Sequence, residues 1–384
     1  MNELVLVVNS GSSSVKYQLL DVAAGRHVAK GVIERVGEPG SDVPDHDAAV
    51  HRVLDELGAA GHDVTRPGGL GAVGHRVVHG GERFVEPTLI DDDVVAAIGE
   101  LVPLAPLHNP GNLAGIAALR RMQPDVAHVA VFDTAFHRTL PRRASTYALP
   151  PDLAHRYGIR RYGFHGTSYS WVARGAAKVL GRPLEDLAMV ILHLGNGASV
   201  AAVQGGQSVD TSMGLTPLEG LVMGTRSGDL DPAIGFHLHR VAGMPYDDIE
   251  ALYTKESGLK GLCGDNDMRE VVRRANAGDD AAALALEVYC YRIRKYVGAY
   301  YAAMGRLDAV VFTAGVGENT PRVRAQALNG LERLGIAIDP VLNNGGRREP
   351  RLISRDDSSI AVLVVPTDEE MEIARQVIAV ASAG

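Results

Sequence analysis

The chain has 384 residues, of which 46% are apolar and 22% are charged, so its length exceeds what one hydrophobic core usually holds. A net charge of -8 and an isoelectric point near 6.0 argue against nucleic acid as a partner. The two cysteines, Cys263 and Cys290, lie far apart and outside any Cys-x-x-Cys motif, which argues against a disulfide framework and a cysteine zinc site.

The N-terminal segment is a short apolar run after the acidic Glu3, without the basic region and long apolar stretch of a secretory signal. Because no apolar run is long enough to cross a bilayer, the sequence predicts a cytoplasmic protein. Apolar runs of strand length occur at residues 4–8, 15–20, 126–132, 189–194, 309–312 and 360–365.

Helical segments are predicted between these strands, which indicates a mixed α/β fold. The clearest helix covers residues 280–304, where apolar side chains recur at about the helical period. Its expected buried face consists of Leu284, Val288, Ile293, Val297 and Tyr301.

Two segments of the chain repeat one pattern of strand, small polar turn and strand, at residues 7–15 and 192–200. A hairpin of this kind leaves backbone N–H groups and hydroxyls free to hold phosphate oxygens without a bulky side chain in the way. Glycine-rich and serine-rich hairpins are common, but two copies at matching strand ends favour duplicated domains that share one nucleotide.

Other motifs are rejected because their context is wrong. Residues 69–74 satisfy Gly-x-Gly-x-x-Gly, but a strand is predicted to follow them where a dinucleotide site needs a helix. A P-loop motif is absent from the sequence. His237 and His239 have the spacing of one strand face but lack a third ligand, so we assign them no metal.

Phosphoryl transfer needs cations, a metal held by oxygen ligands and in-line placement. Arg76 and Arg226 qualify because glycines flank both, and a guanidinium binds carboxylate and phosphate equally well. A structural ion pair remains the alternative for each.

Acidic residues near strand and helix ends are candidate metal ligands. Asp133 follows the predicted strand 126–132, at the edge where parallel sheets place ligands, although aspartate there also caps helices or forms turns. Glu369 and Glu370 belong to a predicted capping box, Thr367 to Glu370, which accounts for Glu370 and leaves Glu369 for another role.

The segment 315–319 carries two glycines between the strand 309–312 and a helix start at Thr320 and Pro321. A glycine turn in this position can seat an adenosine, and a plain connecting loop is the alternative.

Several segments together resemble the acetate kinase family. They are residues 9–16, 75–81, 132–137, 161–168, 193–199, 223–232 and 312–319, which match in order over nearly the whole chain. The resemblance implies α/β architecture with duplicated ribonuclease H-like domains, as in the superfamily of acetate and sugar kinases, heat-shock chaperones and actin. It implies one domain at residues 1–134 plus 372–384 and a second at 135–371 that carries most nucleotide contacts.

The implied activity is reversible transfer of the terminal phosphoryl of ATP to acetate, with Mg²⁺ (or Mn²⁺ in its place), by a homodimer that closes its domains over ATP. Arg76 and Arg226 would bind the acid and the moving phosphoryl, His165 would stabilise its oxygens, and Asn9, Asp133 and Glu369 would support the metal. The implied nucleotide-binding residues are Ser12, Lys16, His193, Asn196, Gly197, Asp267, Met268, Arg269, Gly315, Val316 and Asn319. Val78, Leu107, Phe164 and Pro217 would form an apolar pocket for the methyl group, with His108 beside it.

The sequence departs from the family pattern at Tyr169, where a histidine is usual, and at Met268, where an aromatic residue is common. Methionine offers a softer, less planar surface to a base than phenylalanine does. A propionate or butyrate kinase is the nearest alternative, because pocket size decides chain length. A nucleotide-gated chaperone or filament protein is the alternative of a different class, and it leaves the arginine segments unexplained.

Overall fold

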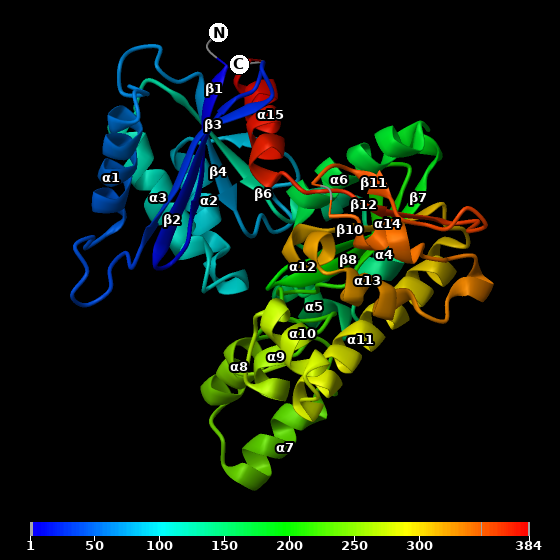
Figure 1. Cartoon of the computed structure of the whole chain (residues 1–384). Coiled ribbons are helices and arrows are strands. Elements are labelled where there is room, and N and C mark those ends of the chain that lie inside the picture. Colours follow the sequence, from blue (N-terminus) through cyan, green and yellow to red (C-terminus); the bar gives the residue numbers. More distant parts are fainter. Residues whose placement is uncertain (1–2, 347, 383–384) are drawn as a thin grey trace. The chain divides into compact units, whose positions relative to one another are not determined.

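The computed structural model describes residues 3–346 and 348–382, which divide into two compact units (Figure 1). Unit 1 comprises Met1–Arg138 and Asp368–Gly384, and unit 2 comprises Thr139–Thr367. The limits predicted from the sequence were residues 134 and 372. The second limit lies earlier in the structure because helix α15 (Glu369–Ala381) packs from its start against the strands of unit 1.

Unit 1 is built on a sheet with strand order β3-β2-β1-β4-β6-β5. The strands are β1 (Leu4–Ser10), β2 (Ser14–Asp21), β3 (Arg26–Glu34), β4 (Ala72–Val77), β5 (Thr88–Leu89) and β6 (Ala127–Phe132). β1 and β2 form the predicted hairpin, with Asn9 opposite Lys16. β1, β4 and β6 are parallel, so their carboxyl ends meet at one edge of the sheet.

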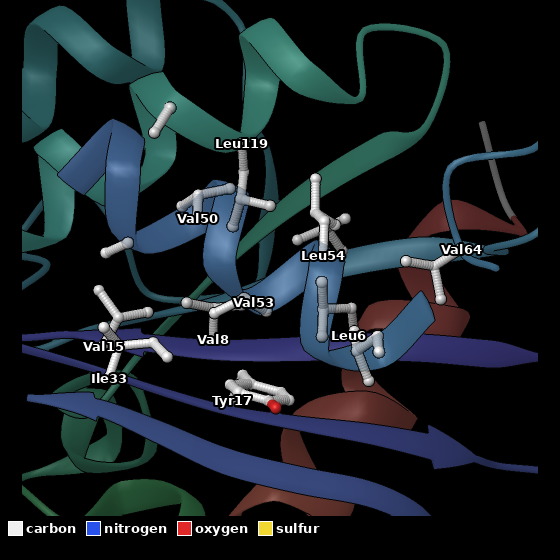
Figure 2. Packing of buried hydrophobic residues seen from close by; sticks show 14 of the residues in the cluster. Leu6, Val8, Val15, Tyr17, Ile33, Val50, Val53, Leu54, Val64 and Leu119 are labelled. Carbon is white, nitrogen blue, oxygen red and sulfur yellow. The ribbon is translucent and has the colours of Figure 1, made fainter. Parts of the chain in front are cut away.

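Helices cover both faces of this sheet. α1 (His46–Ala59) and α3 (Asn109–Met122) lie on one face, and α15, red in Figure 1, packs on β1, β4 and β6. Figure 2 shows Leu6, Val8 and Tyr17 from the strands in one cluster of buried side chains with Val53 and Leu54 of α1. Because side chains alternate along a strand, Val7 points the other way, and Gly74 beside it leaves room for Ile373 and Val377 of α15.

The remaining elements of unit 1 are short. They are α2 (Asp92–Glu100), the 3-10 segment η1 (Val102–Leu104) and, at the first limit between the units, η2 (Ala135–Thr139). Asp45 and Asp91 begin α1 and α2 by accepting hydrogen bonds from Ala48 N–H and Val94 N–H, the usual way to satisfy a first helical turn.

Unit 2 repeats this topology with strand order β11-β12-β10-β7-β8-β9. The strands are β7 (Ala188–Leu194), β8 (Ala198–Gln204), β9 (Gln207–Thr211), β10 (Ala309–Thr313), β11 (Arg351–Leu352) and β12 (Ala361–Val364). β7 and β8 form the second predicted hairpin, and β7, β10 and β12 are parallel. Each strand thus has a counterpart in unit 1, as the repeated sequence pattern predicted.

The helices of unit 2 surround a sheet whose strands β7, β8 and β10 are almost wholly buried. They are α4 (Arg142–Ser145), α5 (Pro151–Arg156), α6 (Gly166–Leu180), α7 (Ala233–Ala242), α8 (Tyr246–Lys255), α9 (Gly258–Cys263), α10 (Met268–Asn276), α11 (Asp280–Met304), α12 (Ala314–Asn319), α13 (Pro321–Leu328) and α14 (Pro340–Asn344), with 3-10 segments η3 (Leu184–Asp186) and η4 (Glu332–Leu334). The bounds predicted for the long helix α11 are confirmed.

The predicted buried face of α11 is only partly right. Ile293 and Val297 are buried, but Leu284 is 55% exposed. The buried stripe instead includes Ala282, Ala285, Leu286, Tyr289, Cys290, Ile293, Val297 and Tyr300. The buried stripe follows the i, i+3, i+4 pattern only when its small alanines are included. The prediction was incomplete because it considered only the larger apolar side chains.

His237 and His239, to which we assign no metal, lie on helix α7, where their spacing does not place them on one face. Two local predictions were wrong. The cap of α15 is Asp368, which accepts from Met371 N–H, while Thr367 N–H instead donates to Glu318 Oε1. The expected glycine turn 315–319 is helical, as part of α12, which begins at Ala314 immediately after β10. The start of α13 at Thr320 and Pro321 is confirmed.

Candidate active site

The strand ends of unit 1 bring Arg76 and Asp133 together. Arg76 lies near the end of β4 and Asp133 directly follows the parallel strand β6, so the two side chains meet at the same sheet edge. Arg76 Nε donates to Asp133 Oδ1 at 2.9 Å and its Nη2 donates to Oδ2 at 2.8 Å. This two-point contact fixes the plane and direction of the guanidinium.

Glu369, in the first turn of α15, lies near the same guanidinium, with its Oε2 3.5 Å from Arg76 Nη2. Burial disfavours the charged form of Arg76, but Asp133 and Glu369 outweigh it, and the pKa of Arg76 is raised. Burial raises the pKa of Asp133, and Arg76 opposes that shift. The pair is therefore a buried ion pair whose members depend on each other.

A cavity of about 410 Å³ in unit 1 opens beside Arg76. It is lined by Val7, Asn9, Lys16, Tyr17, Gln18, Lys30, Gly31, Val32, Arg76, Glu369, Glu370 and Ile373. Asn9 and Glu369, two of the predicted metal ligands, thus share one cavity with Arg76. Asp133 is not among these lining residues, since both its oxygens face the guanidinium.

The donor set around this cavity consists of oxygen atoms. Asn9 offers an amide oxygen, and Glu369 and Glu370 offer carboxylates. Within residues 3–346 and 348–382, histidine, cysteine, aspartate and glutamate side chains nowhere gather in threes as a metal-binding group. A site here therefore needs the amide oxygen of Asn9 or ligands from a substrate, as magnesium sites commonly do.

In unit 2, His165 and His193 stack on each other at the start of α6. Their ring centroids are 4.1 Å apart with an angle of 17° between the rings. His165 Nδ1 is hydrogen-bonded to Ser199 Oγ at 2.8 Å, and His193 Nδ1 to Ser168 Oγ at 2.8 Å. His165 has a left-handed backbone with φ of 59°, a costly conformation for a residue with a Cβ that is found most often at functional sites.

Arg226 approaches the same group of residues from the loop before α7. A Cβ on Gly197 would lie 3.5 Å from Arg226 Nη1 and 3.9 Å from His165 Nε2, so the three residues meet at the β7–β8 turn. Arg226 Nη1 donates to the carbonyl of Pro217 at 3.1 Å. Burial lowers the pKa of Arg226, and no carboxylate in the described part of the chain pairs with it.

A second cavity, of about 610 Å³, lies within unit 2. Its lining contains seven predicted nucleotide residues: Asn196, Asp267, Met268, Arg269, Gly315, Val316 and Asn319. Gly195, Gly224, Leu259, Asn266, Tyr289 and Thr320 complete it. The turn after β7, the starts of α10 and α12 and the middle of α11 thus converge on one space, although they are far apart in sequence.

Two details show why these residues occupy their positions. Asp267 caps α10 by accepting from Arg269 N–H, and its carboxylate also accepts from the Arg269 guanidinium. Gly224 must lack a side chain, because a Cβ there would lie 1.9 Å from Asn196 Oδ1. Asn266 Nδ2 donates to that same oxygen at 3.2 Å and fixes the amide.

The other predicted residues are distributed over both units. Ser12 is exposed in the β1–β2 turn and Lys16 lines the cavity of unit 1, whereas His193 and Gly197 lie outside the lining of the larger cavity in unit 2. Of the apolar pocket, Val78 and Leu107 belong to unit 1, and Phe164 and Pro217 belong to unit 2. Phe164 is buried, Leu107 is exposed, and the other two are half-buried.

Sequence reasoning missed three residues at these cavities. Glu370 was assigned to a cap, yet it lines the cavity of unit 1, where burial raises its pKa. Asn266 directly precedes the recognised Asp267 and could have been found from that position. Tyr289 had no sequence signal, because it resembles any other apolar position of α11.

Solved structures match this fold over nearly its full length. The crystal structure of Porphyromonas gingivalis acetate kinase is 43% identical with a TM-score of 0.93, and the match covers 98% of this chain and 99% of that one. A propionate kinase from Francisella tularensis is 39% identical with a TM-score of 0.91, over 97% of this chain and 98% of that one. The fold of two duplicated α/β domains is therefore shared with these acetate and propionate kinases, and the chain is a phosphotransferase with a carboxyl acceptor.

The chain belongs to the acetokinase family, whose model matches residues 4–375. Acetate kinase from Streptomyces avermitilis is 56% identical, with 97% of this chain and 96% of that protein covered. The expected family is thus confirmed. Among the helices that the structure describes, none combines the length and apolar character needed to cross a membrane.

Proposed function

We propose that the chain catalyses the reversible transfer of the γ-phosphoryl group of ATP to acetate, which yields acetyl phosphate and ADP. The observation that carries the proposal is the half-buried Arg226 guanidinium, which has no carboxylate partner in the described residues and lies against His165 and Gly197. A cation partly removed from water without a counter-ion is costly unless an anion binds to it. The phosphoryl group and the acid are the anions that the family's reaction provides.

The proposed reaction needs no general base. Acetate is ionised at neutral pH, so its oxygen attacks the γ-phosphorus directly. A new bond forms between phosphorus and the acyl oxygen, and the bond from phosphorus to the β–γ bridging oxygen breaks with its electron pair going to ADP. Arg76 and Arg226 bind the acid and the transferring group, and His165 donates to its oxygens.

The residues of unit 1 fit a divalent metal. Asn9 and Glu369 line one cavity with oxygen donors, as Mg²⁺ prefers, and Mn²⁺ accepts the same ligands. The ion supplies positive charge to the phosphate oxygens. We assign Asn9 and Glu369 to hold it and Asp133 to support the site by orienting Arg76.

We propose that the cavity of unit 2 holds the nucleoside. Asp267, Met268, Arg269, Gly315, Val316 and Asn319 would contact the adenosine, while Asn196, Gly197, His193, Ser12 and Lys16 would contact phosphates. The β7–β8 turn and the β1–β2 turn both follow largely buried strands and consist mainly of glycine, serine and asparagine, so no bulky side chain would obstruct a phosphate.

Substrate length depends on Val78, Leu107, Phe164 and Pro217, the proposed pocket for the methyl group. Propionate or butyrate is the second candidate, and the similarity to a protein described as a propionate kinase favours testing it. One methylene changes binding by only about 1–3 kcal/mol, so a preference between these acids is graded.

The deciding experiment measures acyl phosphate as its hydroxamate, with ATP, Mg²⁺ and one acid at a time: acetate, propionate, butyrate or none. We expect the highest kcat/KM for acetate. A higher value for a longer acid would reassign the substrate. Slow ATP hydrolysis at a rate that does not depend on the acid would instead indicate a nucleotide-gated chaperone or filament protein.

We also propose that the chain is a cytoplasmic homodimer. Helix α7 has no buried residue among those described, and Phe236, Val241 and Tyr246 on α7 and α8 are exposed. Exposed apolar helices of this kind usually mark a protein interface. The two cysteines are free thiols, which suits a reducing compartment. Sedimentation analysis of the wild type and of Val241→Glu tests the dimer, because a charge in that interface should yield monomers.

A further inference from the structure

The larger cavity of unit 2 contains a polar group that the proposed reaction does not use. Tyr289, in the middle of α11, lines this cavity and is only 1% exposed. Its hydroxyl is buried and has no hydrogen-bond partner among the described residues. Buried hydroxyls are nearly always paired, because leaving one unpaired costs folding free energy.

The other polar side chains around this cavity differ in that respect. Asn319 Nδ2 donates to the carbonyl of Gly315, Asn266 Nδ2 donates to Asn196, and Asp267 pairs with Arg269. These side chains are therefore oriented before any ligand binds. Tyr289 differs from them because its hydroxyl has no hydrogen-bond partner among the described residues.

The immediate surroundings of Tyr289 favour a base over a phosphate. α9, α10 and α11 pack against one another, and they place Leu259, Met268 and Tyr289 in one wall of the cavity. Such an apolar wall can pack against the flat faces of a purine ring, while a single polar group forms a hydrogen bond with the ring edge. Met268 is unbranched and flexible, so a change of its rotamer can open the wall toward the hydroxyl.

We propose that the Tyr289 hydroxyl determines nucleotide affinity by donating a hydrogen bond to a ring nitrogen of the purine base. This inference rests on the proposed function, since it assumes that the cavity takes the nucleoside of ATP or ADP. The unmet hydrogen bond of the free protein is then formed on binding. The same hydroxyl costs stability in the free protein and contributes affinity in the complex.

The test is Tyr289→Phe beside a matched control, Tyr296→Phe, one heptad further along α11. Tyr296 does not line the cavity, and its hydroxyl donates to Asp229 Oδ2 at 2.9 Å. Calorimetric titration with ADP gives the affinity without catalysis, and thermal unfolding of the free protein gives stability. The KM for acetyl phosphate is the control measurement, because this substrate does not contact the purine base.

We expect Tyr289→Phe to weaken ADP binding about tenfold, with a melting temperature equal to or above wild type and an unchanged KM for acetyl phosphate. Tyr296→Phe should lower the melting temperature and leave ADP affinity within about twofold of wild type. A ligand-binding hydroxyl is thus recognised by a loss of ADP affinity without a loss of melting temperature, and a structural hydroxyl by the reverse.

Unchanged ADP affinity in Tyr289→Phe would overturn the inference, as would a lower melting temperature, which would show that the hydroxyl is already paired in the free protein. Failure of the proposed function has a different signature. A wild type that binds ADP but phosphorylates no acid refutes the reaction and leaves the Tyr289 result valid, whereas a wild type that binds no nucleotide refutes both.

Discussion

Arg76 and Arg226 belong to units with the same strand order, but their electrostatic surroundings are opposite. Arg76 is held at two points by Asp133 and lies near Glu369. Arg226 is half-buried beside His165 and donates to the Pro217 carbonyl and to the Met223 sulfur, with no carboxylate partner among the described residues. The carboxylates compensate the positive charge of Arg76 and orient its guanidinium. The positive charge of Arg226 is free to bind an anion. Two arginines of similar sequence context therefore have different energetic roles, and removing each should affect stability in opposite directions.

Arg226→Ala should have the largest effect on catalysis, a loss of turnover of roughly a hundredfold to a thousandfold, because it deletes an uncompensated charge that stabilises the transferring phosphoryl. The melting temperature should stay the same or rise, since a half-buried cation without a carboxylate partner disappears. Steady-state kinetics and thermal unfolding measure both. Arg226→Lys is the control, and it should recover only part of the turnover because lysine lacks the planar fork. Wild-type turnover in Arg226→Ala would exclude this arginine from the mechanism.

Arg76→Ala should also lower turnover by about a hundredfold, but it should destabilise unit 1 by about 3–5 kcal/mol, because Asp133 is left buried without its partner. Without Arg76, the pKa of Asp133 in the folded state rises further above its unfolded value, so stability is retained at low pH and lost as pH rises. The defect should therefore be larger at pH 7.5 than at pH 4.5 in urea unfolding.

The double variant Arg76→Ala, Asp133→Asn should recover stability near neutral pH without recovering turnover, since the buried charge is gone. An equally unstable double variant would contradict the buried ion pair as the cause.

A pH effect is expected from the histidine pair in the core of unit 1. His75 Nε2 lies 2.9 Å from His128 Nδ1 in the core of unit 1, and burial lowers the pKa of both. A lowered folded pKa means that stability is complete above the unfolded value near 6.5 and declines as pH falls below it. Amide hydrogen exchange should show β4 and β6 losing protection between about pH 6.5 and 5. His75→Gln should make that decline shallower.

The smallest effect is expected from the apolar pocket. Val78→Ala should raise the ratio of kcat/KM for propionate over acetate by about tenfold, because it makes room for one methylene. Val32→Ala is the matched control, since it makes the same change in the cavity of unit 1 outside the proposed pocket. A ratio that stays constant in Val78→Ala would place the acid elsewhere.

Local sequence patterns were enough to predict much of the fold. The apolar runs predicted the central strands, and the repeated hairpin pattern predicted the duplicated sheets. Predictions failed where contacts distant in sequence decide the outcome. Asp368 caps α15, whereas the Thr367 hydroxyl is hydrogen-bonded to Ser168 and the Thr367 N–H donates to Glu318. Leu284 is exposed because alanines form the packed stripe of α11.

The sequence by itself determined the family, the parallel strand ends that carry Arg76 and Asp133, and the set of residues available for phosphate and metal. Strand period, glycine turns and motif order are local properties, so they can be read along the chain. Only the tertiary structure decided which charges are compensated, which residues share a cavity, and that the Tyr289 hydroxyl is buried without a hydrogen-bond partner in the part of the chain that the structure describes. Burial and pairing depend on neighbours from distant segments, and these free energies therefore arise only when the chain is folded.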